Sequence, residues 1–181
     1  MARVLTTDGA THPVDARRRR PRRLAALAMA AAAIVAACSD DGVERDESGQ
    51  IIGAGDVSVF ELAVGDCLDP GEQVGTEIGD IRAVPCDEEH TMEVFALPVW
   101  PDTESDVFPG SNQLSDFADA ACLDEFFGYV GIDYVDSELF FSYLLPTLSG
   151  WNDADPPDRQ VVCVIVTDGE PLTGSVRDSR R

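Results

Sequence analysis

Lysine is absent from the 181 residues of this chain, and histidine occurs only at positions 12 and 90. The 13 Lys and Arg residues are therefore all arginine, against 34 acidic residues, and the formal charge is −21. A protein of this charge repels phosphate backbones and anionic lipid headgroups. We therefore expect no nucleic-acid partner, whereas basic partners and divalent cations remain compatible with the charge.

The N-terminal apolar run, residues 24–37, is too short for a comfortable bilayer span. It follows six arginines between positions 17 and 23 and ends at Cys38. A basic arm, a short apolar core and small residues before the end of the run are typical of an export signal. Residues 1–37 are therefore predicted to be a cleaved signal peptide.

The last four residues of this segment, Val35-Ala36-Ala37-Cys38, resemble a bacterial lipobox. A diacylglyceryl group, with acyl chains such as palmitate, would be attached to Cys38. Two chains give firm anchoring, since each buried CH₂ contributes about 0.8 kcal/mol and one chain binds only marginally. The prediction is a lipoprotein on the extracytoplasmic face of the cell membrane, and the alternative is an ordinary secretory signal. Removing residues 1–37 leaves six arginines and 32 acids, a charge of −26, so the attachment must come from the lipid.

The remaining chain divides into a tether, a domain and a tail. Residues 38–56 are acidic, contain glycine and have little to bury, which predicts a flexible tether after the lipidated cysteine. Residues 57–177 are predicted to form the folded domain, and residues 178–181 a polar tail.

Within the domain, five segments are rich in β-branched and aromatic residues and are predicted to be strands: 57–62, 81–86, 92–99, 139–145 and 160–166. The last is apolar on both faces, so we expect it to be central in the sheet. Between residues 111 and 131, apolar residues recur at helical spacing, with Cys122 on the buried stripe, Ser111 or Asn112 as the cap and Gly128 as the end. The predicted fold is α+β, a small, mainly antiparallel sheet of five or six strands with one main amphipathic helix.

Four cysteines remain after Cys38: Cys67, Cys86, Cys122 and Cys163. An even number in an exported protein predicts two disulfides, and three pairings are open. We favour Cys67–Cys86, which ties the end of the first strand segment to the next strand. The partner pair, Cys122–Cys163, would join the helix to the interior strand.

The stretch "PCDEEHTMEV" (85–94) brings His90, Glu93 and two further glutamates beside Cys86. If Cys86 is in a disulfide it cannot be a metal ligand, and structural zinc normally takes four Cys or His ligands. We therefore expect His90 and Glu93 to be structural or recognition residues, with no metal and no cofactor. Clustered acids at 102–106 and 152–158 suggest calcium, but neither follows the calcium-loop pattern.

Several ordered motifs resemble the actinobacterial septum formation domain family. They are "VGDCLD" (64–69), "VPCDEEHTMEVFALP" (84–98), "PG" (109–110), Cys122, "LPT" (145–147), Trp151, "DRQVVCVIV" (158–166) and "LTGSVR" (172–177). The resemblance covers about residues 57–177 and implies an envelope protein connected with septum formation, often lipid-anchored, with no known reaction. The chain departs from the family pattern at Pro156-Pro157, which lie in an unusually acidic loop.

No catalytic set is evident, since Ser175 lacks the Gly-x-Ser-x-Gly context and His90 would have to be the sole base. Arg159 is expected to pair with a carboxylate and Trp151 to pack over the sheet edge. We expect a non-catalytic cell-envelope lipoprotein that acts in cell division through a protein partner. The alternative is an extracytoplasmic module that binds a ligand or a divalent ion and has no part in division.

Overall fold

The computed structural model describes residues 42–71, 78–101 and 107–181. The predicted signal peptide, the lipidation site at Cys38 and the acidic cluster at 102–106 lie outside these residues. In chain order, the elements are β1 (Glu44–Arg45), β2 (Ile51–Gly53), β3 (Gly55–Ser58), η1 (Val59–Glu61), β4 (Cys67–Leu68), β5 (Asp80–Val84), β6 (Glu89–His90), β7 (Met92–Ala96), α1 (Ser111–Val130), η2 (Tyr134–Asp136), β8 (Phe140–Leu144), α2 (Leu148–Asp153), β9 (Val162–Val166) and β10 (Leu172–Thr173).

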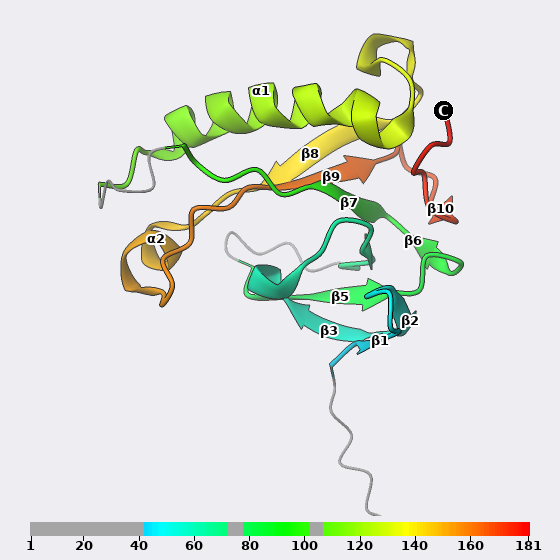
Figure 1. Ribbon diagram of the computed structural model, residues 1–181, viewed down its shortest axis with the longest axis horizontal. Helices are drawn as coiled ribbons and strands as arrows, with labels where there is room; N and C mark the ends of the chain where they lie inside the picture. Colours follow the sequence, from blue (N-terminus) through cyan, green and yellow to red (C-terminus); the bar gives the residue numbers. More distant parts are fainter. Residues whose placement is uncertain (1–41, 72–77, 102–106) are drawn as a thin grey trace, which may run out of the picture. The chain divides into compact units, whose positions relative to one another are not determined.

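The main sheet has six strands in the order β3-β5-β4-β7-β9-β8, and every neighbouring pair is antiparallel. Two two-stranded ladders, β1-β2 and β10-β6, flank it. Helix α1 lies across β7, β9 and β8 on one face (Figure 1). The predicted α+β class and strand number are confirmed. Strand β9, predicted to be central, has a neighbour on each side but lies next to edge strand β8.

The core has two parts because the sheet carries apolar side chains on both faces. One part lies under α1 and is centred on Phe126, Cys122 and Ile165. In the other, Val57 and Ile81 from the β3-β5 half meet Val162 and Val164 from β9. A register irregularity in β7 between Val94 and Ala96 lets Phe95 and Ala96 both contribute to the part under α1. The sheet therefore curves around the second part of the core.

Helix α1 runs where predicted, but its ends differ from the prediction. The segment has no proline and no β-branched residue before Val130, which favours a helix. Its first turn follows Gly110 and has no side-chain cap, so Ser111 and Asn112 do not cap it. The helix continues past Gly128 to Gly131, whose left-handed conformation (φ 84°) ends it with a bond from its N–H to the carbonyl of Phe127. No helix in the described residues is long and apolar enough to cross a membrane.

Both favoured disulfides are present, Cys67–Cys86 and Cys122–Cys163. The first joins β4 to the turn after β5. The second fixes the middle of α1 to β9, and both of its cysteines are fully buried. The stripe that includes Leu114, Ala118, Cys122 and Phe126 therefore faces the sheet as predicted.

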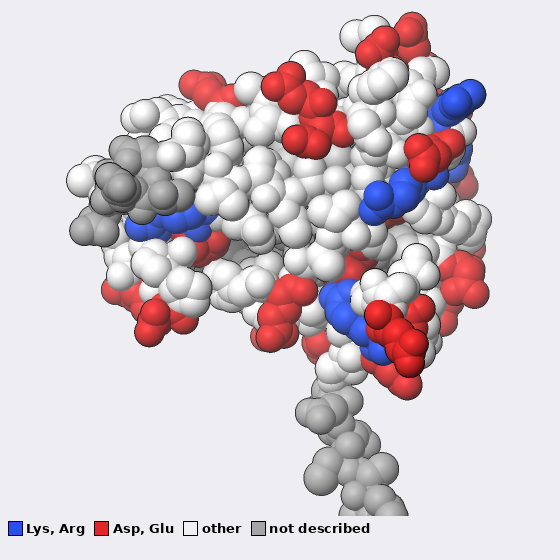
Figure 2. Space-filling view, viewed as in Figure 1, with Lys and Arg blue, Asp and Glu red and all other residues white. Residues whose placement is uncertain are grey.

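Acidic side chains are spread over the face shown in Figure 2, and arginines are few and separate. The charge seen in the sequence is therefore carried by the surface of the folded domain. The buried exceptions among the described residues are Asp66, His90, Glu93 and Arg159.

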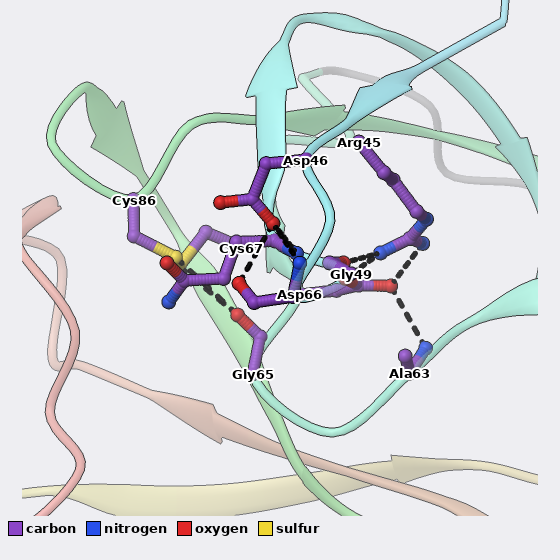
Figure 3. Close-up of polar contacts among 10 residues, drawn as sticks. Arg45, Asp46, Gly49, Ala63, Gly65, Asp66, Cys67 and Cys86 are labelled. Atoms are coloured by element: carbon purple, nitrogen blue, oxygen red, sulfur yellow. Dashed lines mark hydrogen bonds and ion pairs between the residues drawn. A yellow bond between two sulfur atoms is a disulfide. The ribbon is translucent and has the colours of Figure 1, made fainter.

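The flexible tether predicted through residue 56 is wrong over residues 44–56, because strands β1 and β2 and the first half of β3 lie there. Arg45 explains why an acidic segment folds back. Its guanidinium donates to both carboxylate oxygens of Asp66, at 2.6 and 2.7 Å, and one of its nitrogens also donates to the carbonyl of Gly49 (Figure 3). Asp66 is 3 % exposed and also accepts the N–H of Ala63, so it needs this cation.

The tail predicted at residues 178–181 also belongs to the fold. The N–H groups of Asp178 and Arg180 donate to the carbonyls of Tyr129 and Val130 at the end of α1. Arg181 pairs with Glu138 at 2.8 Å on the surface. The bonds from Asp178 and Arg180 satisfy carbonyls of the last helical turn, which have no partner within the helix.

The Arg45–Asp66 pair gives a test of whether the N-terminal strands belong to the fold. We expect Arg45→Met to lower the free energy of unfolding by about 1–3 kcal/mol, because it leaves a buried carboxylate short of donors. Arg181→Met is the matched control, since its ion pair is exposed and should contribute at most about 0.5 kcal/mol. Urea denaturation followed by circular dichroism measures both. Equal effects would mean that β1 is only loosely attached.

Candidate functional site

Glu93 is a fully buried carboxylate on interior strand β7. Its Oε1 accepts hydrogen bonds from the hydroxyl of Tyr129 at 2.6 Å and the hydroxyl of Ser175 at 2.5 Å. Its Oε2 accepts the backbone N–H of Val176 at 2.8 Å. A carboxylate buried without such donors would cost several kcal/mol, so these three bonds are what allow Glu93 to lie inside.

The bonds to Glu93 join the end of helix α1 and the C-terminal segment to the sheet. Next to them, β10 pairs with β6, with Leu172 opposite His90 and Thr173 opposite Glu89. The N–H of Gly174 donates to the carbonyl of Cys86 at 2.6 Å. The motif residues 84–98 and 172–177, distant in sequence, therefore form one structural unit next to the Cys67–Cys86 disulfide.

His90 is also fully buried, and its neighbours indicate which of its ring nitrogens donates a hydrogen bond. Nδ1 lies 2.9 Å from the carbonyl oxygen of Glu88. A carbonyl only accepts, so Nδ1 carries a proton and donates. Nε2 has no hydrogen-bond partner among the described residues, and it lies 4.0 Å from Oε2 of Glu93, beyond hydrogen-bond distance. His90 thus supports the turn after the disulfide, as a structural residue would.

The ligand atoms of Cys67, His90 and Glu93 lie within 4.8 Å of one another. This trio is the one potential metal-binding group of three or more such residues in the part of the chain that the structure describes. Cys67 is in a disulfide and cannot offer a thiolate. Both oxygens of Glu93 already accept hydrogen bonds. The donor set therefore does not fit a structural metal.

The Glu93 centre does not fit a catalytic site either. Glu93 and His90 are 0 % exposed, so no substrate reaches them. Burial and the bond to Glu93 raise the pKa of the Tyr129 phenol above its usual range, and the guanidinium of Arg177, 4.4 Å from the ring centroid, opposes this shift. Tyr129 therefore remains a hydrogen-bond donor at neutral pH. The arrangement holds the fold together.

Trp151 and Arg159, which the sequence analysis singled out separately, lie together at the opposite end of the sheet, near α2 (Figure 1). Trp151 is 1 % exposed, and the guanidinium of Arg159 lies 3.7 Å from its ring centroid. Nη1 of Arg159 donates to the carbonyls of Trp151 and Asp158, at 2.8 and 3.0 Å. Among the described residues no carboxylate forms an ion pair with Arg159; its guanidinium instead donates hydrogen bonds to a carbonyl within α2 and to one in the loop before β9.

A groove that was not predicted lies beside this pair. It has a volume of about 770 Å³, within the range of ligand sites. Apolar side chains from both halves of the curved sheet line it, among them Val59, Phe60, Leu144 and Val162. It also includes Asp155 to Asp158, the acidic loop with the two prolines. The exposed Phe60 within a predicted strand was the available clue, but periodicity does not show which apolar residues stay uncovered.

The Glu93 centre can be tested by removing its acceptors in steps. We expect Glu93→Ala to lower the free energy of unfolding by about 3–5 kcal/mol, because three donors lose their partner. Glu93→Gln should cost less. Its amide N can replace Oε1, since the hydroxyls of Tyr129 and Ser175 can turn to accept, while its carbonyl still accepts from Val176.

Urea denaturation ranks the two variants, and hydrogen exchange at the Val176 amide reports the local bond. Tyr129→Phe is a control that removes one donor and should cost about 1 kcal/mol. Wild-type stability in Glu93→Ala, with unchanged protection of Val176, would contradict this assignment.

Comparison with known proteins gives one informative match. The family model described as septum formation matches residues 47–179, which covers both ends of the Glu93 centre, both disulfides and the groove. No curated protein and no solved structure gave a significant match. The match extends beyond the predicted domain at both ends and includes strand β2, which lies in the predicted tether. The chain therefore belongs to the septum formation family.

Proposed function

We propose that this protein is a non-catalytic lipoprotein of the cell envelope that acts in septum formation by binding a protein partner. The observation that carries the proposal is the family match over residues 47–179, which includes nearly all of the described fold. A role related to cell division follows from that match. The septum formation family is not a known enzyme family.

The arrangement of the polar residues supports binding over catalysis. The buried acid and histidine are closed off from solvent, while the large open groove is mostly apolar. Catalysis needs a nucleophile or an acid–base pair within reach of substrate, whereas recognition needs an accessible apolar surface with a few polar groups. The groove meets the second requirement.

The divalent-ion alternative has weaker support. In the acidic loop before β9, Asp153 and Asp155 are exposed, and Oδ1 of Asp158 accepts the N–H of Gln160. Among the described residues, no potential metal-binding group includes these carboxylates. A calcium site would need six to eight oxygens around one point.

Time-lapse imaging of the tagged full-length chain through division of its native host tests the division role. The tag needs a flexible linker, because the carbonyl of Arg181 accepts a hydrogen bond from Ser137. We expect enrichment at the nascent septum. A uniform envelope signal through the whole cell cycle would sink the proposal of a septal role.

Cys38→Ala tests the proposed anchor separately. We expect the wild-type chain to sediment with membranes and the variant to be released or to keep its signal peptide uncut, because no acyl chains are attached. Cell fractionation with immunoblotting measures both the partition and the chain length. Membrane association and processing that match the wild type would rule out lipidation at this position.

A further inference from the structure

We propose that the groove beside α2 binds an extended peptide segment of a partner protein, with an apolar side chain in the groove and a neighbouring Lys or Arg on the acidic loop. The inference deepens the proposed function and rests on it, since it assumes that the protein acts by binding a partner. It adds the binding surface, the conformation of the bound segment and the chemistry of its side chains.

The apolar wall of the groove is already exposed without a partner. Phe60 in η1 is 58 % exposed and Val99 is 49 % exposed, and both line the groove. Deeper in the groove, Val162 belongs to the second part of the core, and Val59, Ile78 and Leu144 pack against it. An apolar side chain entering here would extend that core and remove Phe60 from water, which is favourable in proportion to the area covered.

The accessible charge of the groove is negative. Its charged lining residues are Asp155, Asp158 and Arg159. Arg159 is 9 % exposed, and its guanidinium stacks on Trp151 and donates to two carbonyls. Asp155 is exposed, and burial raises the pKa of the half-buried Asp158. A cation from the partner would stabilise both carboxylates, whereas an acidic segment would be repelled.

The shape of the wall favours a peptide over a compact small molecule. Tyr143, Leu144 and Leu145 all line the groove, although successive side chains of a strand point to opposite faces. The groove therefore runs along the edge of the sheet at residues 143–145 and is not confined to one face. Strand β8 is the last strand of the sheet, and no further strand pairs with it within the described ranges. Every second residue of such an edge directs its N–H and C=O outward, where an extended segment can add as a strand.

Selection from random peptides tests this without assuming the partner. The full chain, purified in detergent, is panned against phage-displayed random dodecapeptides, and enriched peptides are synthesised with a fluorophore for polarisation titrations. We expect the enriched sequences to share an apolar residue beside Lys or Arg. Phe60→Ser should weaken their binding by about tenfold or more, because truncation of an aromatic anchor removes a hot spot.

Two controls make the outcome specific. Phe127→Ser changes a phenylalanine on α1 that is also 58 % exposed and is outside the groove, so binding should not change. The double variant Asp155→Asn with Asp158→Asn keeps the size of both side chains, and it should weaken binding and reduce its dependence on salt. Thermal unfolding of each variant confirms that the fold is intact.

Three results would overturn the proposal: no enrichment, enriched peptides without basic residues, or equal binding by wild type and Phe60→Ser. A dimer in sedimentation experiments that dissociates on Phe60→Ser would also overturn it, because a second copy would then occupy the groove. The test is independent of the imaging. Septal enrichment without peptide binding would overturn the peptide-binding proposal and leave the division role standing. Peptide binding without septal enrichment would overturn the division role and leave the binding groove standing.

Discussion

The buried carboxylate of Glu93 is the constraint on which the rest of the structure depends. Its three donors come from the last turns of α1 and from residues 175–176, which are 36 to 83 positions away in sequence. Glu93 is fully buried, so these three donors take the place of water around its carboxylate. The carboxylate is therefore satisfied only when the helix and the C-terminal segment have both docked on β7. A polar group inside a small core thus selects one arrangement of three elements, which apolar packing alone specifies less sharply.

This constraint also divides the molecule into a closed end and an open end. At the closed end, the Cys67–Cys86 disulfide, the β6-β10 ladder and the Glu93 bonds surround Glu93 and His90, whose side chains are both fully buried. At the open end, near α2, the two halves of the curved sheet separate enough to leave a groove. The stacking of Arg159 on Trp151, together with its bond to the Trp151 carbonyl, ties α2 to the segment before β9 at that end. If the groove is the binding surface, as proposed, stability and recognition are carried by different residues, and a variant at one end can be interpreted separately from the other.

The parts of the fold that the sequence predicted are those set by local periodicity and by cysteine count. The strands around residues 92–99 and 160–166, the helix with Cys122 on its buried stripe, and both disulfides depend on such patterns. The strands between residues 44 and 56 were missed because their composition is that of a tether, and one long-range pair, Arg45–Asp66, holds them. Glu93 and His90 were singled out by residue type, but Tyr129 and Ser175, the partners of Glu93, lie too far along the chain for spacing to reveal.

The groove and the charge of the domain are best understood together. An exposed apolar surface favours self-association of a protein. A high net charge opposes it, because copies of like charge repel each other. With six arginines and 32 acids after residue 37, two copies repel each other, and the acidic loop stands directly at the groove. The same field attracts a basic segment and raises the rate at which it arrives. In the proposed binding mode, the high negative charge would therefore both oppose self-association at the apolar groove and favour a cationic partner.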